Sequence, residues 1–129
     1  MKAAKILYVK LAMDWTKNPD LKSIDDLRGG LGPGGMTAPW AELPGLRHKY
    51  FIWHEETQTC SGVYVFYDDE SLKKYMESDL FKAHESFPHV TSIDAQVKDV
   101  MQGTELSIEK TACWAANKSF EVLKSNKFI

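Results

Sequence analysis

The chain has 129 residues, 43% of them hydrophobic and 26% charged, which excludes a disordered or fibrous protein and fits one globular domain over residues 1–129. Sixteen Lys and Arg against 18 Asp and Glu leave a net charge of -2 without a basic block, so we expect no nucleic-acid partner. Two cysteines are too few for a disulfide scaffold, and no apolar run is long enough for a secretory signal or a membrane span, so we expect a cytoplasmic protein with no membrane partner.

The first part of the chain predicts a strand followed by a short helix. Residues 4–12 are rich in Ile, Leu, Val and Tyr without a breaker, which is typical of a strand buried on both faces. Asp20, together with the leucine and isoleucine residues that recur every third position after it, predicts a helix over 20–28.

A glycine- and proline-rich loop follows over residues 28–46. It holds six glycines and three prolines, so it cannot be regular throughout, and we interpret it as a lid. Thr37 predicts the cap of one helical turn around Pro39 to Leu43, which would fix Trp40 on the body of the protein. The run 30–35 matches G-x-G-x-x-G, but it contains a proline and does not follow a strand within a βαβ unit, so we expect no dinucleotide.

The middle of the chain predicts a β-hairpin, the clearest structural feature of the sequence. Aromatic and β-branched residues fill 47–55 and 61–67, with a short polar connection between them. Asp68 then predicts the N-cap of one helix that ends about four turns later, at Pro88. Its apolar stripe consists of Leu72, Tyr75, Met76, Leu80 and Phe81.

The C-terminal part predicts a last strand and an extension. Residues 90–101 alternate apolar and polar side chains, as a half-buried strand does, whereas the extension 102–129 is ambiguous between an edge strand and a short helix. The order β-α-β-β-α-β predicts an α+β, ferredoxin-like fold, in which an antiparallel four-stranded sheet carries both helices on one face. About 100 residues suffice for this unit, so the surplus in the loop 28–46 and in the extension is where we expect substrate specificity.

His84 is the first candidate catalytic residue. It follows Leu80 by four positions and Phe81 by three, so it lies beside the apolar stripe of the helix, where it could act as a general base near neutral pH. The alternative is a helix-end histidine that interacts with the dipole at the C-terminus of the helix.

Lys49 is the second candidate. It shares one strand face with Phe51 and Trp53, and a lysine between two aromatic residues must either reach solvent or find a partner. A buried Lys49 could polarise a carbonyl or stabilise an enolate or phenolate. The alternative is an ion pair with Asp94 or Glu55.

Aromatic residues supply the remaining candidates. Tyr64, on the strand after Lys49, could donate its hydroxyl to the same substrate oxygen, although a lone strand tyrosine more often belongs to the core. Tryptophans could line a pocket for an aromatic ligand, or simply fill a small core or a dimer interface. The expected substrate-binding residues are Tyr8, Trp40, Phe51 and Trp53.

Metal ligation and thiol chemistry receive little support. His48 and His54 lie six positions apart on one strand, about 20 Å by strand rise, so they cannot share an ion. None of the four histidines has metal-ligand spacing, and we expect no metal. Cys60 and Cys113 have no evident base beside them, so neither is a candidate nucleophile.

Several short pieces of the chain together resemble a known family. Pro44–Leu46, Lys49–Phe51, Ser61–Phe66 and the helix capped by Asp68 are similar to the monooxygenases related to the bacterial YdhR protein, in the dimeric α+β barrel superfamily. The resemblance covers roughly residues 44–101. It implies a homodimer in which two sheets face each other as a barrel, each subunit keeping a pocket between sheet and helices. Relatives include cofactor-free oxygenases and polyketide cyclases, and fold alone does not choose among them.

The leading hypothesis is therefore a cofactor-independent monooxygenase acting on an aromatic or polyketide-like small molecule. A base would form a carbanion or enolate that reacts with dioxygen. The same anion in a polyketide cyclase would instead close a ring or a lactone. A non-catalytic ligand-binding dimer, or a partner protein of a larger synthase, remains the other alternative. Catalysis requires that His84, Lys49 and Tyr64 lie close together.

Overall fold

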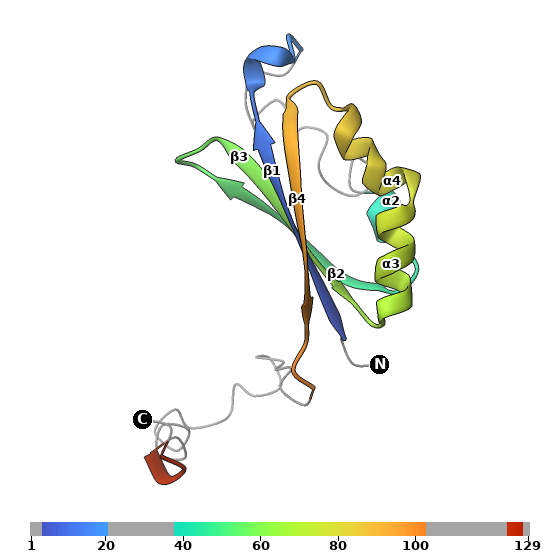
Figure 1. The fold of residues 1–129 in the computed structure, drawn as a ribbon, viewed down its shortest axis with the longest axis vertical. Coiled ribbons are helices and arrows are strands. Elements are labelled where there is room, and N and C mark those ends of the chain that lie inside the picture. The colour runs from blue at the N-terminus through green and yellow to red at the C-terminus, as the bar shows by residue number, and fades with distance from the viewer. Residues whose placement is uncertain (1–3, 21–37, 103–123, 128–129) are drawn as a thin grey trace.

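The computed structural model describes residues 4–20, 38–102 and 124–127, and these form one four-stranded antiparallel sheet with helices against one face (Figure 1). The strands follow in the spatial order β2-β3-β1-β4. Their bounds are β1 Lys5–Met13, β2 Leu46–His54, β3 Thr59–Phe66 and β4 Val90–Asp99. This order is that of the ferredoxin-like α+β fold, so the predicted fold class and the predicted hairpin are confirmed.

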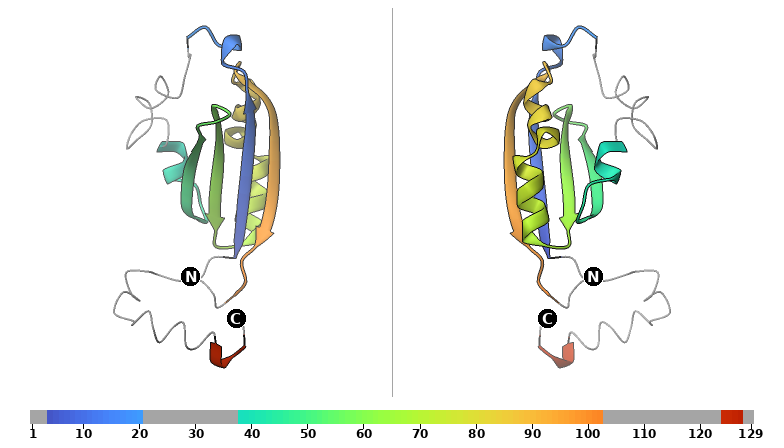
Figure 2. Two further views of the ribbon diagram at one scale, coloured as in Figure 1. Left: turned by 90° about the vertical axis from the view of Figure 1, so that its left-hand side faces the viewer. Right: turned by 90° about the vertical axis from the view of Figure 1, so that its right-hand side faces the viewer.

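The described helices are all short. In chain order they are the 3-10 turn η1 Trp15–Lys17, α2 Ala38–Ala41, α3 Asp69–Glu77, α4 Asp79–Lys82 and the 3-10 turn η2 Ala83–Ser86. Figure 2 shows α3 and α4 stacked end to end along one face of the sheet, with α2 beside β2 at the edge. None of the helices in the described ranges is long and apolar enough to cross a membrane.

The single helix expected between Asp68 and Pro88 is in fact broken at Ser78, so that prediction was wrong. Ser78 has an extended backbone, its hydroxyl donates to the Tyr75 carbonyl, and its oxygen accepts from the Phe81 amide at 3.2 Å. A serine that caps a new helix in this way ends the preceding one. The chain therefore bends around the sheet before it reaches His84.

Strand β1 is covered on one face only, which corrects the expectation of burial on both. Leu7 and Val9 lie beneath the helices and are 0% and 1% exposed, whereas Tyr8 is half-buried and Lys10 is exposed. Side chains alternate between the two faces of a strand, so Tyr8 and Lys10 lie on the face away from the helices.

The core lies between the sheet and α3. Its buried members are Leu7, Val9, Trp40, Tyr64, Phe66, Leu72 and Tyr75. The predicted stripe of α3 supplies two of them, and its remaining members, Met76, Leu80 and Phe81, pack on the cluster while staying partly exposed. Trp40 reaches the core from α2, as the predicted helical turn at 39–43 required.

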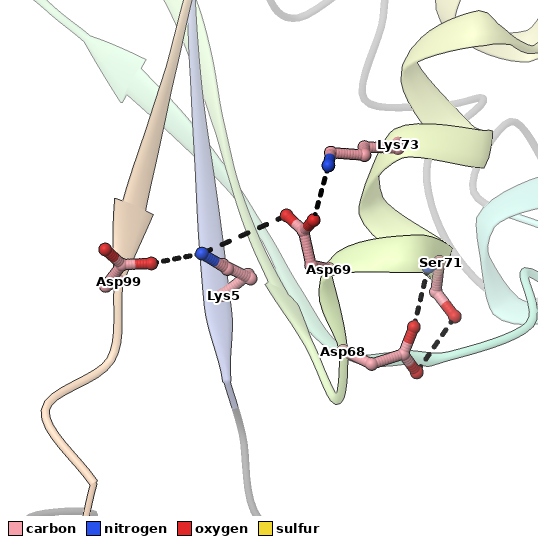
Figure 3. Close-up of polar contacts among 6 residues, drawn as sticks. All are labelled: Lys5, Asp68, Asp69, Ser71, Lys73 and Asp99. Atoms are coloured by element: carbon pink, nitrogen blue, oxygen red, sulfur yellow. Dashed lines mark hydrogen bonds and ion pairs between the residues drawn. The ribbon is translucent and has the colours of Figure 1, made fainter.

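Ion pairs tie the start of α3 to the edge of the sheet (Figure 3). Lys5 on β1 contacts Asp99 on β4 and lies 3.9 Å from Asp69 in the first turn of α3. Asp69 is also 2.7 Å from Lys73, one helical turn further on. Asp69 and Asp99 are partly or largely exposed, so we expect this network to orient α3 rather than to contribute much stability.

The turn before β2 requires glycine at position 45. Gly45 has a φ of +79°, and a Cβ there would lie 2.1 Å from Oγ of Ser71. We expect Gly45→Ala to lower the free energy of unfolding by about 2 kcal/mol or more, through backbone strain and overlap with α3. Urea unfolding measures this. Adding Ser71→Gly should recover part of the loss, whereas a single variant as stable as the wild type would contradict the contact.

Some expected features lie outside the described residues. They are the helix over 20–28 apart from Asp20, the cap Thr37, the run 30–35, Cys113, and the extension apart from residues 102 and 124–127. The part of the lid that is described, 38–46, forms α2 and the turn into β2.

Candidate functional site

Lys49 lies in a cage of aromatic rings on the helix-covered face of the sheet. Its Nζ is 3.7 Å from the ring centre of Tyr64, 4.0 Å from that of Phe51 and 5.0 Å from that of Trp40. The hairpin register creates this arrangement, because Lys49 pairs with Tyr64 and Phe51 with Gly62 across β2 and β3. We call Trp40, Phe51 and Tyr64 the aromatic cage. An ammonium over aromatic faces is attracted to them, but it gains no full counter-charge.

The amine of Lys49 is desolvated but not enclosed. Burial lowers the pKa of Lys49 from 10.5 to about 7. The alternative of an ion pair with Asp94 or Glu55 is not found, since Glu55 instead accepts the Trp53 indole N–H at 2.7 Å and Asp94 accepts from the Gln96 amide. Among the described residues no enclosed side-chain nitrogen lacks a hydrogen-bond partner. Nζ of Lys49 has no such partner, so it is not fully enclosed.

Gly62 leaves the space that the amine occupies. A Cβ at this position would lie 2.8 Å from Cε2 of Tyr64 and 3.1 Å from Nζ of Lys49. Glycine inside a strand often marks the close approach of another group, and here that group is the lysine amine. A glycine inside the predicted strand 61–67 was the sequence signal for this close approach.

We expect Gly62→Ala to expel Lys49 from the cage. The buried ring of Tyr64 cannot retreat, so the cost to the free energy of unfolding should be about 1–3 kcal/mol. The pKa of Lys49 should return toward 10.5 as the amine moves into water. Urea unfolding and NMR titration of the lysine side chain measure the two effects. Cys60→Ala, on the same strand face, is the matched control, and an unchanged Lys49 titration in Gly62→Ala would contradict the contact.

Tyr64 lies in the core rather than at the surface. It is 1% exposed, and its hydroxyl accepts a hydrogen bond from the Tyr75 hydroxyl at 3.0 Å, which in turn accepts from the Trp40 indole at 3.0 Å. Burial raises the pKa of Tyr64 far above its usual value. Tyr64 thus presents its ring face to Lys49, and the Tyr75 bond holds that ring in place. Tyr75 was expected only as a core residue, because its helical spacing carried no other signal.

His84 lies in η2, at the end of the helical segment, and only one of its two ring nitrogens makes a hydrogen bond within the described residues. Nδ1 lies 2.8 Å from the Phe81 carbonyl, the helix-end contact foreseen as the alternative. A carbonyl only accepts, so Nδ1 carries the proton and neutral His84 keeps a basic lone pair on Nε2. His84 is 7% exposed, and by the same reasoning as for Lys49 its Nε2 is not fully enclosed. Burial, reinforced by the charge of Lys49, lowers the pKa of His84, while the Phe81 contact opposes the shift.

Trp40 brings the two candidates together. Its ring centre is 5.0 Å from Nζ of Lys49 and 6.2 Å from the ring centre of His84. Trp40 also packs edge-on against Phe51 at 5.8 Å. The structure therefore places Lys49 and His84 against the same Trp40 ring, and such a base and cation are the groups needed to remove a proton and hold the resulting anion.

Trp53 lies on the same sheet face but in a neighbouring aromatic group. Its ring centre is 6.4 Å from that of Trp15, which stacks on His89 at 4.8 Å. His89 in turn stacks on Phe87 at 5.8 Å, and Phe87 is 6.3 Å from His84. Among the described residues, the ring contacts of Trp53 lead to His84 through Trp15, His89 and Phe87.

Tyr8 is not part of this site. Its hydroxyl points to Ser61 Oγ at 3.4 Å on the opposite face of the sheet, where Ser61 also lies 2.7 Å from Nε2 of His54. In the described ranges no three His, Cys, Asp or Glu side chains come close enough to hold a metal ion. Cys60 is half-buried, and burial raises the pKa of its thiol, which leaves it little thiolate.

Sequence comparison places most of this site within a known family. Residues 34–111, more than half of the chain, match the family model described as "Putative mono-oxygenase ydhR". The match includes both Lys49 and His84. No curated protein matches the chain.

Solved structures share the fold at low sequence identity. A protein of unknown function from Nitrosomonas europaea aligns with a TM-score of 0.59 at 13% identity, over 81% of this chain and 96% of its own. The monooxygenase ActVA-Orf6 of Streptomyces coelicolor, solved with nanaomycin D, aligns with a TM-score of 0.55 at 14% identity, over 81% and 94%. SnoaB of Streptomyces nogalater, a cofactor-independent oxygenase, gives 0.53 at 6% identity, over 82% and 100%.

Proposed function

The chain belongs to the ydhR mono-oxygenase family, and from that premise we propose that it is a mono-oxygenase that needs no cofactor and oxidises a hydroxylated aromatic or polyketide-like molecule. The observation that carries the proposal is the convergence of an amine and an imidazole, Lys49 and His84, on the ring of Trp40. The likeness in fold to SnoaB supports a reaction without a cofactor. The rings around Lys49 support an aromatic substrate, because they can stack on one.

In the proposed reaction His84 is the general base. Its Nε2 takes a proton from an activated C–H group of the substrate, and the resulting carbanion, delocalised as a phenolate or enolate, lies against the Lys49 ammonium. Tyr64 is a positioning residue here, since its buried ring supports the amine and its hydroxyl is bonded to Tyr75. The direct hydroxyl donation expected of Tyr64 is not part of this proposal.

The oxidation balances with dioxygen alone. The carbanion passes one electron to dioxygen, and the substrate radical and superoxide combine to form a C–O bond. The imidazolium of His84 returns its proton to the peroxide, giving a hydroperoxide. Loss of water then breaks the O–O bond and removes the second C–H hydrogen, so that CH₂ and O₂ become C=O and H₂O. The substrate supplies all the electrons, and its delocalised anion is what makes the first transfer feasible.

We predict a narrow bell-shaped dependence of kcat/KM on pH. Activity should rise as His84 loses its proton, with an apparent pKa below 6.5, and fall as Lys49 loses its own near pH 7. In Lys49→Arg, which stays charged, the falling limb should disappear. Initial rates between pH 5 and 9 measure this, and a falling limb that survives in Lys49→Arg would assign it to another group.

The experiment that tests the proposal is incubation with hydroxylated anthrones, naphthols and polyketide-like triketones, with and without oxygen, followed by mass spectrometry. We expect a product that is heavier by one oxygen and lighter by two hydrogens, formed only with oxygen. An isomer or a dehydrated ring product formed without oxygen would instead identify a cyclase or lactone-forming enzyme. Binding without turnover across the panel would identify a ligand-binding protein.

We also propose that the protein works as a homodimer through the sheet face away from the helices. Half-buried Tyr8, Val63 and Val65 and the exposed Tyr50, 59% accessible, lie on this face and form an apolar surface. Light scattering should give twice the monomer mass of 14.7 kDa, and Val63→Lys should halve it. A monomeric wild type would contradict the homodimer alone.

A further inference from the structure

We propose that Lys49 is also an amine nucleophile, which condenses with an aromatic aldehyde or ketone to form a covalent imine. This activity needs no oxygen, so it stands or fails independently of the proposed mono-oxygenation. It rests on the aromatic cage, on the lack of a counter-charge at Lys49 among the residues that the structure describes, and on the neighbouring imidazole.

The cage leaves the amine without the contacts that usually occupy a lysine. Nζ lies over the rings of Tyr64 and Phe51 at 3.7 and 4.0 Å, and it has neither a hydrogen bond nor an ion pair within the described part of the chain. Desolvated lysines of this kind serve as Schiff-base nucleophiles. Burial lowers the pKa of Lys49 to about 7, so a large fraction of the amine has a free lone pair at neutral pH.

The exposed wall of the cage is where we place the approach of a carbonyl compound. Nζ is not fully enclosed, and Phe51, which forms this wall, is 45% exposed. The partner that fits such surroundings is flat and aromatic, because its ring can stack on Phe51 or Trp40. The imine, once protonated, carries its positive charge where the ammonium was, over the same ring faces.

The condensation balances with water as the only other product. The Nζ lone pair attacks the carbonyl carbon, a C–N bond forms, and the carbonyl oxygen takes a proton to give a carbinolamine. The C–O bond then breaks, the hydroxyl leaves as water, and the amine loses its remaining proton. We assign the transfer of the amine proton to the leaving hydroxyl to His84, whose ring contacts the same Trp40 as Lys49 and whose Nε2 makes no hydrogen bond within the described residues.

The test traps the imine on the full chain. The protein is incubated with 2-naphthaldehyde and sodium cyanoborohydride at pH 7.5, and peptide mass spectrometry measures the secondary amine formed at each lysine. We expect Lys49 to react about 10-fold or more faster than two exposed lysines, Lys82 on α4 and Lys98 on β4. Butanal, which has no ring, should show less preference for Lys49. Equal rates at Lys49 and Lys98 would overturn the proposal.

Two variants separate this activity from mono-oxygenation. Lys49→Arg keeps the positive charge at position 49 but cannot form the imine. The adduct at position 49 should therefore vanish, while part of the oxygen uptake persists. Lys98→Met is the matched control and should leave labelling of Lys49 unchanged. If Lys49→Arg does not fold, the ratio of Lys49 to Lys98 adducts in the wild type still shows whether Lys49 is the preferred nucleophile. Labelling without oxygen uptake would reject only the mono-oxygenase, and oxygen uptake without labelling would reject only the imine.

Discussion

Lys49→Met should yield a protein that is more stable than the wild type and at least about 100-fold less active in the proposed oxidation. A pKa lowered from 10.5 to about 7 means that the folded site disfavours the ammonium by about 5 kcal/mol as an upper bound. Methionine has a similar shape and makes favourable contacts with aromatic rings. We therefore expect a gain of about 2 kcal/mol in the free energy of unfolding at pH 6.

The pH dependence of the free energy of unfolding tests whether the amine of Lys49 is the cause of this expected gain. The folded-state pKa lies below the unfolded value, so from pH 7 to 10.5 the unfolded chain binds more protons than the folded one. The free energy of unfolding of the wild type should rise over this interval, and Lys49→Met should lack that rise. Urea unfolding at pH 6 and pH 9.5 measures both. Exposed Lys98→Met should change stability by less than about 0.5 kcal/mol, and a destabilised Lys49→Met would show that the amine is well solvated.

His84→Asn should lower kcat/KM by about 100- to 10,000-fold, the range for loss of a general base. The asparagine amide can still donate to the Phe81 carbonyl, as Nδ1 of His84 does at 2.8 Å, but it offers no base in place of Nε2. We therefore expect the free energy of unfolding to fall by no more than about 1 kcal/mol.

The rising limb of the pH profile distinguishes a base from a packing residue. In His84→Asn the residual rate should no longer rise with an apparent pKa below 6.5. Glu77→Gln, at an exposed position at the end of α3, is the control and should keep kcat/KM within about 2-fold. Retention of the rising limb in His84→Asn would assign the base elsewhere.

Local periodicity predicted the strands well but the long helix only in part. The hairpin followed from two β-branched runs, and Leu72 and Tyr75 are buried as the apolar stripe required. The break at Ser78 was missed because the stripe continues across it, with Leu80 and Phe81 still packed on the core. The signal was the pair Ser78–Asp79, a capping residue followed by an acidic first turn.

The faces of β1 could have been read more closely. Leu7 and Val9 alternate with Tyr8 and Lys10, so the lysine already marked the outward face. The structure buries only one face of this strand and turns Tyr8, expected as a substrate-binding residue, toward Ser61 on the other face.

Local sequence patterns could not predict that Lys49 and His84 both contact Trp40. Strand alternation placed Lys49 beside Phe51, but it did not supply the register that sets Lys49 opposite Tyr64 and above Gly62. Trp40 arrives from the loop before β2, and His84 from beyond the helix break. Such contacts between distant segments depend on how loops and bends close, which no periodicity encodes.

Oxygen-isotope labelling tests the central claim most directly. Protein stripped of metals with a chelator and free of flavin absorbance is incubated under ¹⁸O₂ with the best substrate of the panel. We predict that the product gains one ¹⁸O atom, that the other appears in water, and that adding flavin or metal leaves the rate unchanged. Product oxygen derived from water, or turnover that begins only when flavin or metal is restored, would contradict cofactor-free mono-oxygenation.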